Sequence, residues 1–377
     1  MTMPVQPLDE ALSAGAETSG QRPPRLAGLD IARGFAVLAM TVVNYRLTMT
    51  EEGAGPAWLR TASTALDGRA AATFVVLAGI GASLLSSKGR VDAQARPAAR
   101  RRMARRAAFL FVLGWAFFTI WPADILHYYG VYLAVGTALL FVANRVLLRI
   151  ATAAVLVSFA FILSFDYFAR WDLATLAYAG LNTPVGFARN LLLDGFHPVL
   201  PWIAFYLFGM WLGRCDLRDP VLRRRLVVSA ASIVALTESA AWFLVGPKGA
   251  PVHSLAPTSW RWLFWVEPIP PMPAYLAAGG GTAVLVIVGS LWLGEHLPLR
   301  VSEPLVSTGQ LALTLYLAHV LVGLGILSGL GRLKDQTLGY AVAAALLFDA
   351  AAVAFCFAWR RRFARGPLEW VMRRVAG

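Results

Sequence analysis

Long apolar stretches alternate with short polar segments along almost the whole chain. Ten of these stretches are roughly 17–25 residues long, the length that an α-helix needs to cross about 30 Å of hydrocarbon. They predict membrane-spanning helices near residues 31–49, 67–86, 104–121, 125–142, 146–165, 197–214, 223–246, 273–294, 304–327 and 338–360. We therefore expect an all-α polytopic membrane protein with about ten transmembrane helices, forming a single domain over residues 30–377.

The first 29 residues have a different pattern. They are polar, rich in Pro, Ala and Gly, and contain no apolar core. A cleavable signal peptide would need such a core. Residues 1–29 are therefore predicted to form a disordered cytoplasmic tail.

The distribution of Lys and Arg predicts which ends of the helices face the cytoplasm. With the N-terminus inside, the segments that alternate on the inner side hold 25 of the 34 basic residues, and the outer segments hold nine. Cytoplasmic loops carry an excess of Lys and Arg. The pattern predicts a multi-pass protein of the cell membrane with both termini cytoplasmic.

Composition narrows the class further. Hydrophobic residues make up 58% of the chain and charged residues only 15%, which excludes a cytosolic enzyme or a secreted disulfide scaffold. The net charge of +13 is explained by loop charges in a bilayer, so no nucleic-acid partner is expected. The two cysteines, Cys215 and Cys356, are predicted to be free thiols.

Two outer segments contain an Asp three residues before a His. Asp124 precedes His127 at the start of the fourth predicted span, and Asp194 precedes His197 at the start of the sixth. A carboxylate can orient an imidazole and raise its basicity, which a general base requires. Each pair could instead cap a helix. We rank His127 first, because the short connection before it would hold it rigidly.

The first span carries polar residues at both ends. Arg33 and Asn44 are eleven residues apart, so they share one helix face about 16 Å apart along the axis. Asp30 and Arg33 can pair at the inner end. An ion pair that only caps the helix start is the alternative.

The ninth span is polar on two sides, which places it at the centre of the bundle. It contains His319; polar residues such as Ser307 and Thr314 could serve packing alone. Because Asn44, His127, His197 and His319 lie on spans one, four, six and nine, we expect these four spans to line one cavity.

Two further acids, Glu238 and Asp349, fall inside predicted spans. They could relay protons or form structural pairs. The sequence contains no metal-ligand spacing and no nucleotide-binding loop, so no metal is expected. Two long outer segments, 166–196 and 247–272, contain Trp and Pro and are predicted to anchor at the interface or to cover an outer cavity.

Several motifs occur in an order that resembles one family. They are Arg25-Leu-Ala-Gly-Leu-Asp30-Ile-Ala-Arg33-Gly with Asn44-Tyr45, Asp67-Gly68, His197-Pro-Val-Leu-Pro201-Trp202 with Gly213-Arg214, Gly309-Gln-Leu-Ala-Leu-Thr314-Leu-Tyr316-Leu-Ala-His319, and Gly366-Pro-Leu-Glu369-Trp370. Together they resemble the heparan-α-glucosaminide N-acetyltransferase-like and YeiB-like membrane proteins.

The resemblance implies a transmembrane acyltransferase that takes acyl-CoA, with acetyl-CoA as the expected form, at the cytoplasmic face. It would pass the acyl group to an amine or hydroxyl of a glycan or small molecule on the other side. Related O-acetylating enzymes carry a His where this chain has Asn44, and the heparan enzymes place their key His in the next outer loop. Residues 46–66 contain no His here.

The predicted site combines these observations. His127, Asp124, His197 and Asn44 are the expected catalytic residues, and Arg33, Arg214, His319 and Trp202 the expected acyl-CoA-binding residues. An acyltransferase is the preferred function. A multi-pass transporter or flippase that uses intramembrane acids is the alternative, and a non-catalytic relative that kept the fold is a third. A homodimer is left open.

Overall fold

The computed structural model describes residues 26–51, 53–172, 175–246 and 259–377. Within these ranges the chain is almost entirely helical, with one two-stranded sheet formed by β1 (Trp171–Asp172) and β2 (Ala177–Tyr178). In the described part of the chain, seven helices are long and apolar enough to cross a membrane: Ala27–Met49, Ala57–Leu85, Asn144–Ser164, Pro220–Leu244, Pro273–His296, Ala312–Gly329 and Leu338–Arg362. An eighth results if Pro184–Asp194 and Val199–Leu212, bent by 47° against each other, count as one span.

Every predicted span coincides with a helix. In order, these helices are α2 (Ala27–Met49), α4 (Arg69–Leu85), α6 (Arg96–Phe118), α7 (Leu126–Leu139), α8 (Asn144–Ser164), α10 (Val199–Leu212), α11 (Pro220–Leu244), α12 (Pro273–His296), the pair α13 (Leu299–Gln310) and α14 (Ala312–Ala318), and α16 (Leu338–Arg362). Helices α6 and α7 do not qualify as spans by length and composition, because the first half of α6 carries arginines and α7 has only 14 residues. Helix α10 qualifies only together with Pro184–Asp194, and the ninth segment qualifies over Ala312–Gly329, without α13. Ten spans and cytoplasmic termini stay predictions.

Helix α2 begins earlier than the sequence pattern predicts. It starts at Ala27 rather than near residue 31, and it buries Gly28, Leu29 and Asp30. Position 28 must be Gly, because a Cβ there would lie 2.3 Å from the backbone of Leu291 on α12. Most of the predicted tail, residues 1–25, lies outside the described residues, as do residues 247–258 of the second long outer segment.

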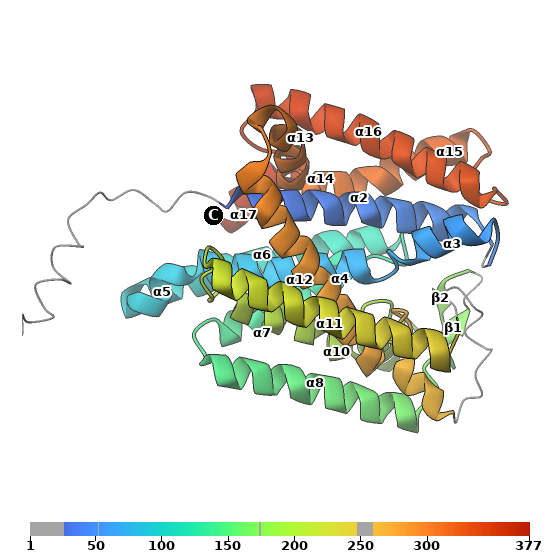
Figure 1. The fold of residues 1–377 in the computed structure, drawn as a ribbon, viewed down its shortest axis with the longest axis horizontal. Coiled ribbons are helices and arrows are strands. Elements are labelled where there is room, and N and C mark those ends of the chain that lie inside the picture. Colours follow the sequence, from blue (N-terminus) through green and yellow to red (C-terminus); the bar gives the residue numbers. More distant parts are fainter. Residues whose placement is uncertain (1–25, 52, 173–174, 247–258) are drawn as a thin grey trace, which may run out of the picture.

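The helices form an elongated bundle with two distinct ends (Figure 1). We call one the loop end; it holds α3 (Ala57–Thr64) and strands β1 and β2. We call the other the arginine end; it holds α5 (Ser87–Val91) and the C-terminal helix α17 (Pro367–Ala376). Helix α2 runs through the bundle and packs against α4, α12, α13 and α16.

At the arginine end, side-chain contacts connect segments that the sequence predicts to lie on the inner side of the membrane. Arg214, after α10, donates to the carbonyls of Leu140 and Val142 at 3.0 and 2.6 Å. Arg223, in the first turn of α11, pairs with Glu295 in the last turn of α12 at 2.6 Å. These predicted inner segments, which are rich in Lys and Arg, therefore lie together at one end of the bundle.

Helices α6 and α7 form a close hairpin. A Cβ at Gly114 would lie 2.2 Å from the backbone nitrogen of His127, and one at Gly130 would lie 2.5 Å from Cβ of Phe111. Only glycine allows the two backbones to approach this far. The start of α7, which carries His127, is thus fixed by packing as well as by the short connection.

The ninth predicted span is not one continuous helix. It is divided into α13, α14, the π-helical turn η5 (His319–Leu324) and α15 (Gly325–Gly329). The break between α13 and α14 falls at Leu311, whose backbone leaves the helical region with φ −107° and ψ 19°. Hydropathy detects the apolar length of such a segment but not its breaks.

The remaining short elements connect these helices. They are η1 (Ala93–Ala95), α9 (Pro184–Arg189), the π-helical turn η2 (Asn190–Asp194) and η4 (Trp260–Phe264).

Candidate active site

A cavity of about 710 Å³ opens at the loop end. Its wall includes the last turns of α2, the segment that precedes α4, His197 before α10, and Tyr316 of α14. The polar side chains of the wall include Asn44, Arg46, Asp67, His197 and Tyr316. Arg46 and Asp67 form an ion pair in this wall.

Asn44 joins α2 to the broken ninth segment. Its amide nitrogen Nδ2 lies 2.8 Å from Nε2 of His319, which is only 1% exposed. An amide nitrogen can only donate, so Nε2 of His319 accepts and the neutral ring carries its proton on Nδ1. This leaves a second N–H of Asn44 for a ligand in the cavity.

A buried carboxylate–imidazole pair lies behind the same wall. Nδ1 of His127 is 2.9 Å from Oδ2 of Asp124, and the backbone nitrogen of His127 donates to the same oxygen at 3.1 Å. The Tyr316 hydroxyl donates to Oδ1 of Asp124 at 3.0 Å and accepts from the backbone nitrogen of Ile125 at 3.1 Å. The predicted Asp124–His127 pair therefore forms and is connected to the cavity by Tyr316.

The four predicted spans converge, but their polar residues occupy two layers. Asn44 and His197 line the cavity. His127 and His319 are each 1% exposed and lie behind it, one in contact with Asp124 and the other with Asn44. His197 therefore lines the cavity, whereas His127 does not.

Asp194 does not orient His197 as the sequence spacing suggests. Its carboxylate accepts from the Tyr178 hydroxyl at 2.7 Å and from Arg189 at 2.5 Å. Asp194 is the last residue of the π-helical turn η2, and the extended Gly195 follows it, so Asp194 and His197 do not share a helix face. Burial, together with the hydrogen bond to Asp194, raises the pKa of Tyr178 well above its usual value.

His197 is held by aromatic side chains instead. Its ring centroid lies 4.7 Å from that of Trp202 and 6.1 Å from that of Tyr128. Its Nδ1 is buried without a hydrogen-bond partner among the described residues. Such an atom in a cavity wall is typical of a site completed by water or ligand.

Trp202, an expected acyl-CoA-binding residue, lies at the loop end beside His197. It is fully buried and also contacts the rings of Phe205 and Tyr275. Arg214 follows it by twelve residues, which corresponds to about 18 Å along a helix. The two residues therefore could not hold the same end of a ligand.

Arg214 has structural contacts at the arginine end. Besides the carbonyls of Leu140 and Val142, its guanidinium donates to Asn144 at 2.9 Å. These bonds satisfy carbonyls at the C-terminus of α7, which otherwise lack partners. The two terminal nitrogens of Arg214 thus make capping contacts, whereas its Nε is buried without a hydrogen-bond partner among the described residues.

Arg33 lies deeper in the bundle. It donates to Asp30 at 2.6 Å, its side chain is 28% exposed, and Asp30 also accepts from Gln310 at 3.2 Å. Arg33 is not part of the cavity wall; it forms a polar group with Asp30 and Gln310 near the start of α2.

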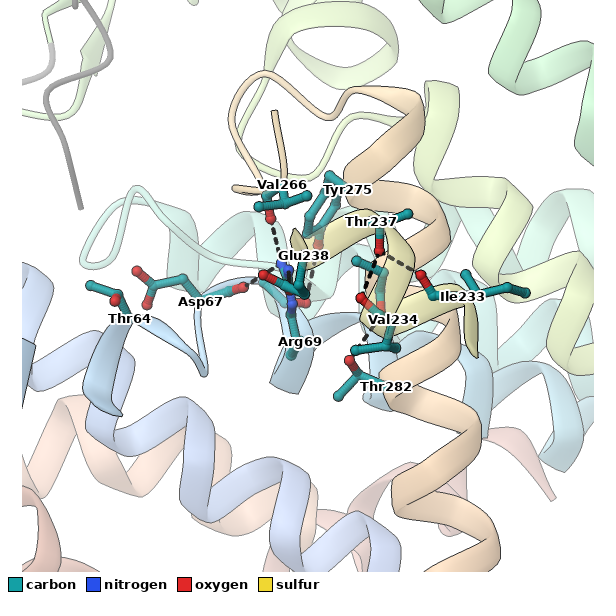
Figure 2. Close-up of polar contacts among 12 residues, drawn as sticks. Thr64, Asp67, Arg69, Ile233, Val234, Thr237, Glu238, Val266, Tyr275 and Thr282 are labelled. Atoms are coloured by element: carbon teal, nitrogen blue, oxygen red, sulfur yellow. Dashed lines mark hydrogen bonds and ion pairs between the residues drawn. The ribbon is translucent and has the colours of Figure 1, made fainter. Parts of the chain in front are cut away.

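Glu238 forms an ion pair between helices. Figure 2 shows its carboxylate beside Arg69, which donates to it at 2.5 Å and to the carbonyl of Val266 at 2.5 Å. Arg69 also lies 5.5 Å from the ring centroid of Tyr275. This arrangement favours the structural interpretation of Glu238 over a proton relay.

The second acid predicted within a span, Asp349, is buried on α16, where its side chain is 7% exposed.

The sequence patterns do not predict the roles of Tyr316 and Glu369. Tyr316 is three residues before His319, and only the fold brings it to Asp124. Glu369 of α17 accepts from the backbone nitrogens of Leu313 and Thr314 at 2.8 and 3.0 Å and from the Thr314 hydroxyl at 2.6 Å. It thereby caps α14 at its break.

Two protein-family models match the chain. The catalytic region of heparan-alpha-glucosaminide N-acetyltransferase matches residues 25–243, more than half of the chain. The chain belongs to this membrane acetyltransferase family. A second family, described as a protein of unknown function (DUF418), matches residues 219–377. The two matches support the resemblance to YeiB-like and heparan-α-glucosaminide N-acetyltransferase-like proteins. No curated protein matches the chain.

The family matches divide the site between them. Asn44, Asp124, His127 and His197 fall in the first match, whereas Tyr316, His319 and Glu369 fall in the second. The hydrogen bonds from Asn44 to His319 and from Tyr316 to Asp124 connect the two regions. The site is therefore assembled from both parts of the chain.

Proposed function

We propose that this protein transfers an acyl group, acetyl in the first place, from acyl-CoA to an amine or hydroxyl acceptor held in the cavity. The acceptor would be a small molecule or a glycan. In this proposal the arginine end faces the cytoplasm of a cell membrane, since basic residues concentrate on that side. The loop end would then face outward.

The observation that carries the proposal is the polar assembly at the cavity wall. Asn44 is fixed by His319, and Tyr316 is fixed by the buried Asp124–His127 pair. Burying this many polar groups inside a membrane protein costs free energy, which is typical of a functional site. Family membership supports acetyl-CoA as the donor.

The geometry suggests a division of roles. The acceptor nitrogen or oxygen attacks the thioester carbonyl carbon, the carbon–sulfur bond breaks, and CoA leaves as the thiol or thiolate. His197, in the wall, would accept the proton of the acceptor as general base. The free N–H of Asn44 would donate to the carbonyl oxygen as negative charge develops on it. The Asp124–His127 pair would position Tyr316.

The test uses purified protein in vesicles with radiolabelled acetyl-CoA outside and envelope extract or amino sugars as acceptors. We expect CoA release together with label in an acceptor. If neither occurs for any acceptor, and label accumulates inside the vesicles as intact small molecules, the protein is a transporter and the proposal is wrong.

A further inference from the structure

The C-terminal helix α17 is docked on the break in the ninth predicted span. The Glu369 carboxylate accepts from the backbone nitrogen of Thr314 at 3.0 Å and from its hydroxyl at 2.6 Å. The same hydroxyl accepts from the backbone nitrogen of Leu368 at 3.2 Å. A Cβ at Gly366 would lie 2.8 Å from Cγ of Leu311. The chain therefore enters α17 directly against the break between α13 and α14.

The segment that α17 contacts also carries part of the candidate active site. Tyr316, two residues after Thr314, lies in the cavity wall and donates to Asp124 at 3.0 Å. His319, directly after α14, lies 2.8 Å from the amide nitrogen of Asn44. A contact that holds α17 in place therefore also holds the segment that positions these side chains.

The side of α17 that turns away from the bundle is both apolar and basic. Its inward side packs on the core through Leu368 and Met372. The residues on the opposite side are exposed, and we call them the α17 face: Trp370, Val371, Arg374 and Val375. Trp370 is 48% exposed, and the Arg374 guanidinium lies 5.0 Å from its ring centroid. Exposed apolar and basic residues on one short helix are typical of a helix in the headgroup region of a bilayer.

The position of α17 in the chain agrees with this location. The helix follows α16, which is long and apolar enough to cross a membrane and ends at Arg362. Only residues 363–366 connect the two helices, and a connection of this length reaches at most about 14 Å. Helix α17 therefore begins near the level at which α16 would leave the hydrocarbon.

The chain around α17 has a large excess of positive charge. Residues 360–374 include six arginines and one acid, Glu369, whose carboxylate is engaged with α14. Five of these arginines are exposed and form no ion pair with any residue that the structure describes: Arg361, Arg362, Arg365, Arg373 and Arg374. Several Lys or Arg residues beside a membrane span favour anionic phospholipid.

We propose that the α17 face binds anionic phospholipid at the membrane surface, and that this contact stabilises the break in the ninth predicted span. Trp is enriched where headgroups meet hydrocarbon. Arg can pack its stem on apolar surface while its guanidinium bonds headgroup phosphates. A ligand that binds the docked form of α17 stabilises that form. The effect of lipid charge thereby reaches Tyr316 and His319 through Glu369.

The experiment compares two membranes of different charge. The full chain is placed in nanodiscs of phosphatidylcholine, alone or mixed with phosphatidylglycerol, without acyl donor or acceptor. Amide hydrogen exchange is followed in α17 and in α14. Because no substrate is present, the result does not depend on the proposed function, and either proposal can fail without the other.

The variants remove either the α17 face or the same charge elsewhere. The test variants are Trp370→Ala and the double variant Arg373→Gln/Arg374→Gln. The matched control is Arg224→Gln/Arg225→Gln, at two exposed positions near the start of α11, which also lies at the arginine end.

We expect phosphatidylglycerol to slow exchange in both helices by about tenfold or more in the unchanged protein and in the control. One Arg near an anionic surface contributes about fivefold in affinity. The test variants should lose most of this effect in both helices. Equal slowing in test and control variants overturns the inference, because it would then reflect the general charge of this end.

A second copy of the chain is the other occupant that the experiment can detect. The inference is overturned if α17 exchanges slowly in either lipid when a disc holds two copies, and rapidly when it holds one. In that case the α17 face would be an interface between two chains.

Glu369→Gln tests the connection between the lipid contact and the cavity wall. The variant keeps the α17 face but removes the charged acceptor at the break, and a melting curve checks that it folds. Phosphatidylglycerol should still slow exchange in α17 but no longer in α14. If the slowing in α14 persists, or if α14 of the unchanged protein does not respond to lipid, the proposed stabilisation of the break is wrong.

Discussion

Nδ2 of Asn44 lies 2.8 Å from Nε2 of His319, although the two residues are 275 positions apart in the sequence. This contact holds the amide group at the wall of the cavity. The proposed role of Asn44 is therefore to donate a hydrogen bond rather than to accept a proton.

Asn44→Ala should lower kcat for acetyl transfer by about 100-fold, because loss of one donor to a developing oxyanion typically costs that much. The KM for acetyl-CoA should change little. Steady-state kinetics of the reconstituted protein measure both. Thr48→Val is the matched control, since Thr48 lines the same cavity but its hydroxyl bonds its own helix at 2.7 Å; an equal loss in both variants would contradict the assignment.

His197→Ala should reduce turnover by about 100-fold or more, as expected for loss of a general base. His127→Ala should retain more than a tenth of the turnover per folded molecule, because His127 lies behind the wall. His296→Ala, at an exposed histidine, should have no effect. If His127→Ala abolishes transfer and His197→Ala does not, the order suggested by the sequence is right and the one proposed here is wrong.

Tyr316→Phe should lower the free energy of unfolding by about 1–3 kcal/mol, since it leaves Oδ1 of Asp124 and the Ile125 N–H without this partner. Tyr340→Phe, which removes a partly exposed hydroxyl on α16, is the control. Thermal melting in detergent compares the two variants. Identical melting temperatures would show that the Tyr316 hydroxyl contributes no stability.

Glu369→Ala should also destabilise the protein by about 1–3 kcal/mol, because two backbone N–H groups and a hydroxyl lose a charged acceptor. Amide hydrogen exchange should rise in α14, near residues 312–318. Glu303→Ala, at an exposed acid on α13, should leave both measurements unchanged. Unaltered exchange in α14 would mean that α17 does not support the break.

The orientation in the membrane can be tested by cysteine labelling. In a background with Cys215 and Cys356 replaced by Ser, Ala177→Cys at the loop end should react with an impermeant maleimide in intact cells. Gln94→Cys at the arginine end should react only after permeabilisation. The opposite pattern would invert the proposed topology. Ala256, a second outer position by sequence, lies outside the described residues.

The sequence determined the class of the protein and the positions of its helices. Apolar length and the alternation of Lys and Arg are local properties, so each predicted span coincides with a helix without knowledge of its neighbours. The Asp124–His127 pair could also be predicted from the sequence, because residues three positions apart at a helix start lie close together independently of tertiary packing.

Tertiary structure decided which residues reach the cavity. The same three-residue spacing fails for Asp194 and His197, since the helical turn ends at Asp194 and an extended glycine follows it. The contacts of Asn44 with His319, of Tyr316 with Asp124, and of Glu369 with α14 join segments far apart in the chain. Such contacts depend on how helices pack, and periodicity within one helix carries no information about its partner.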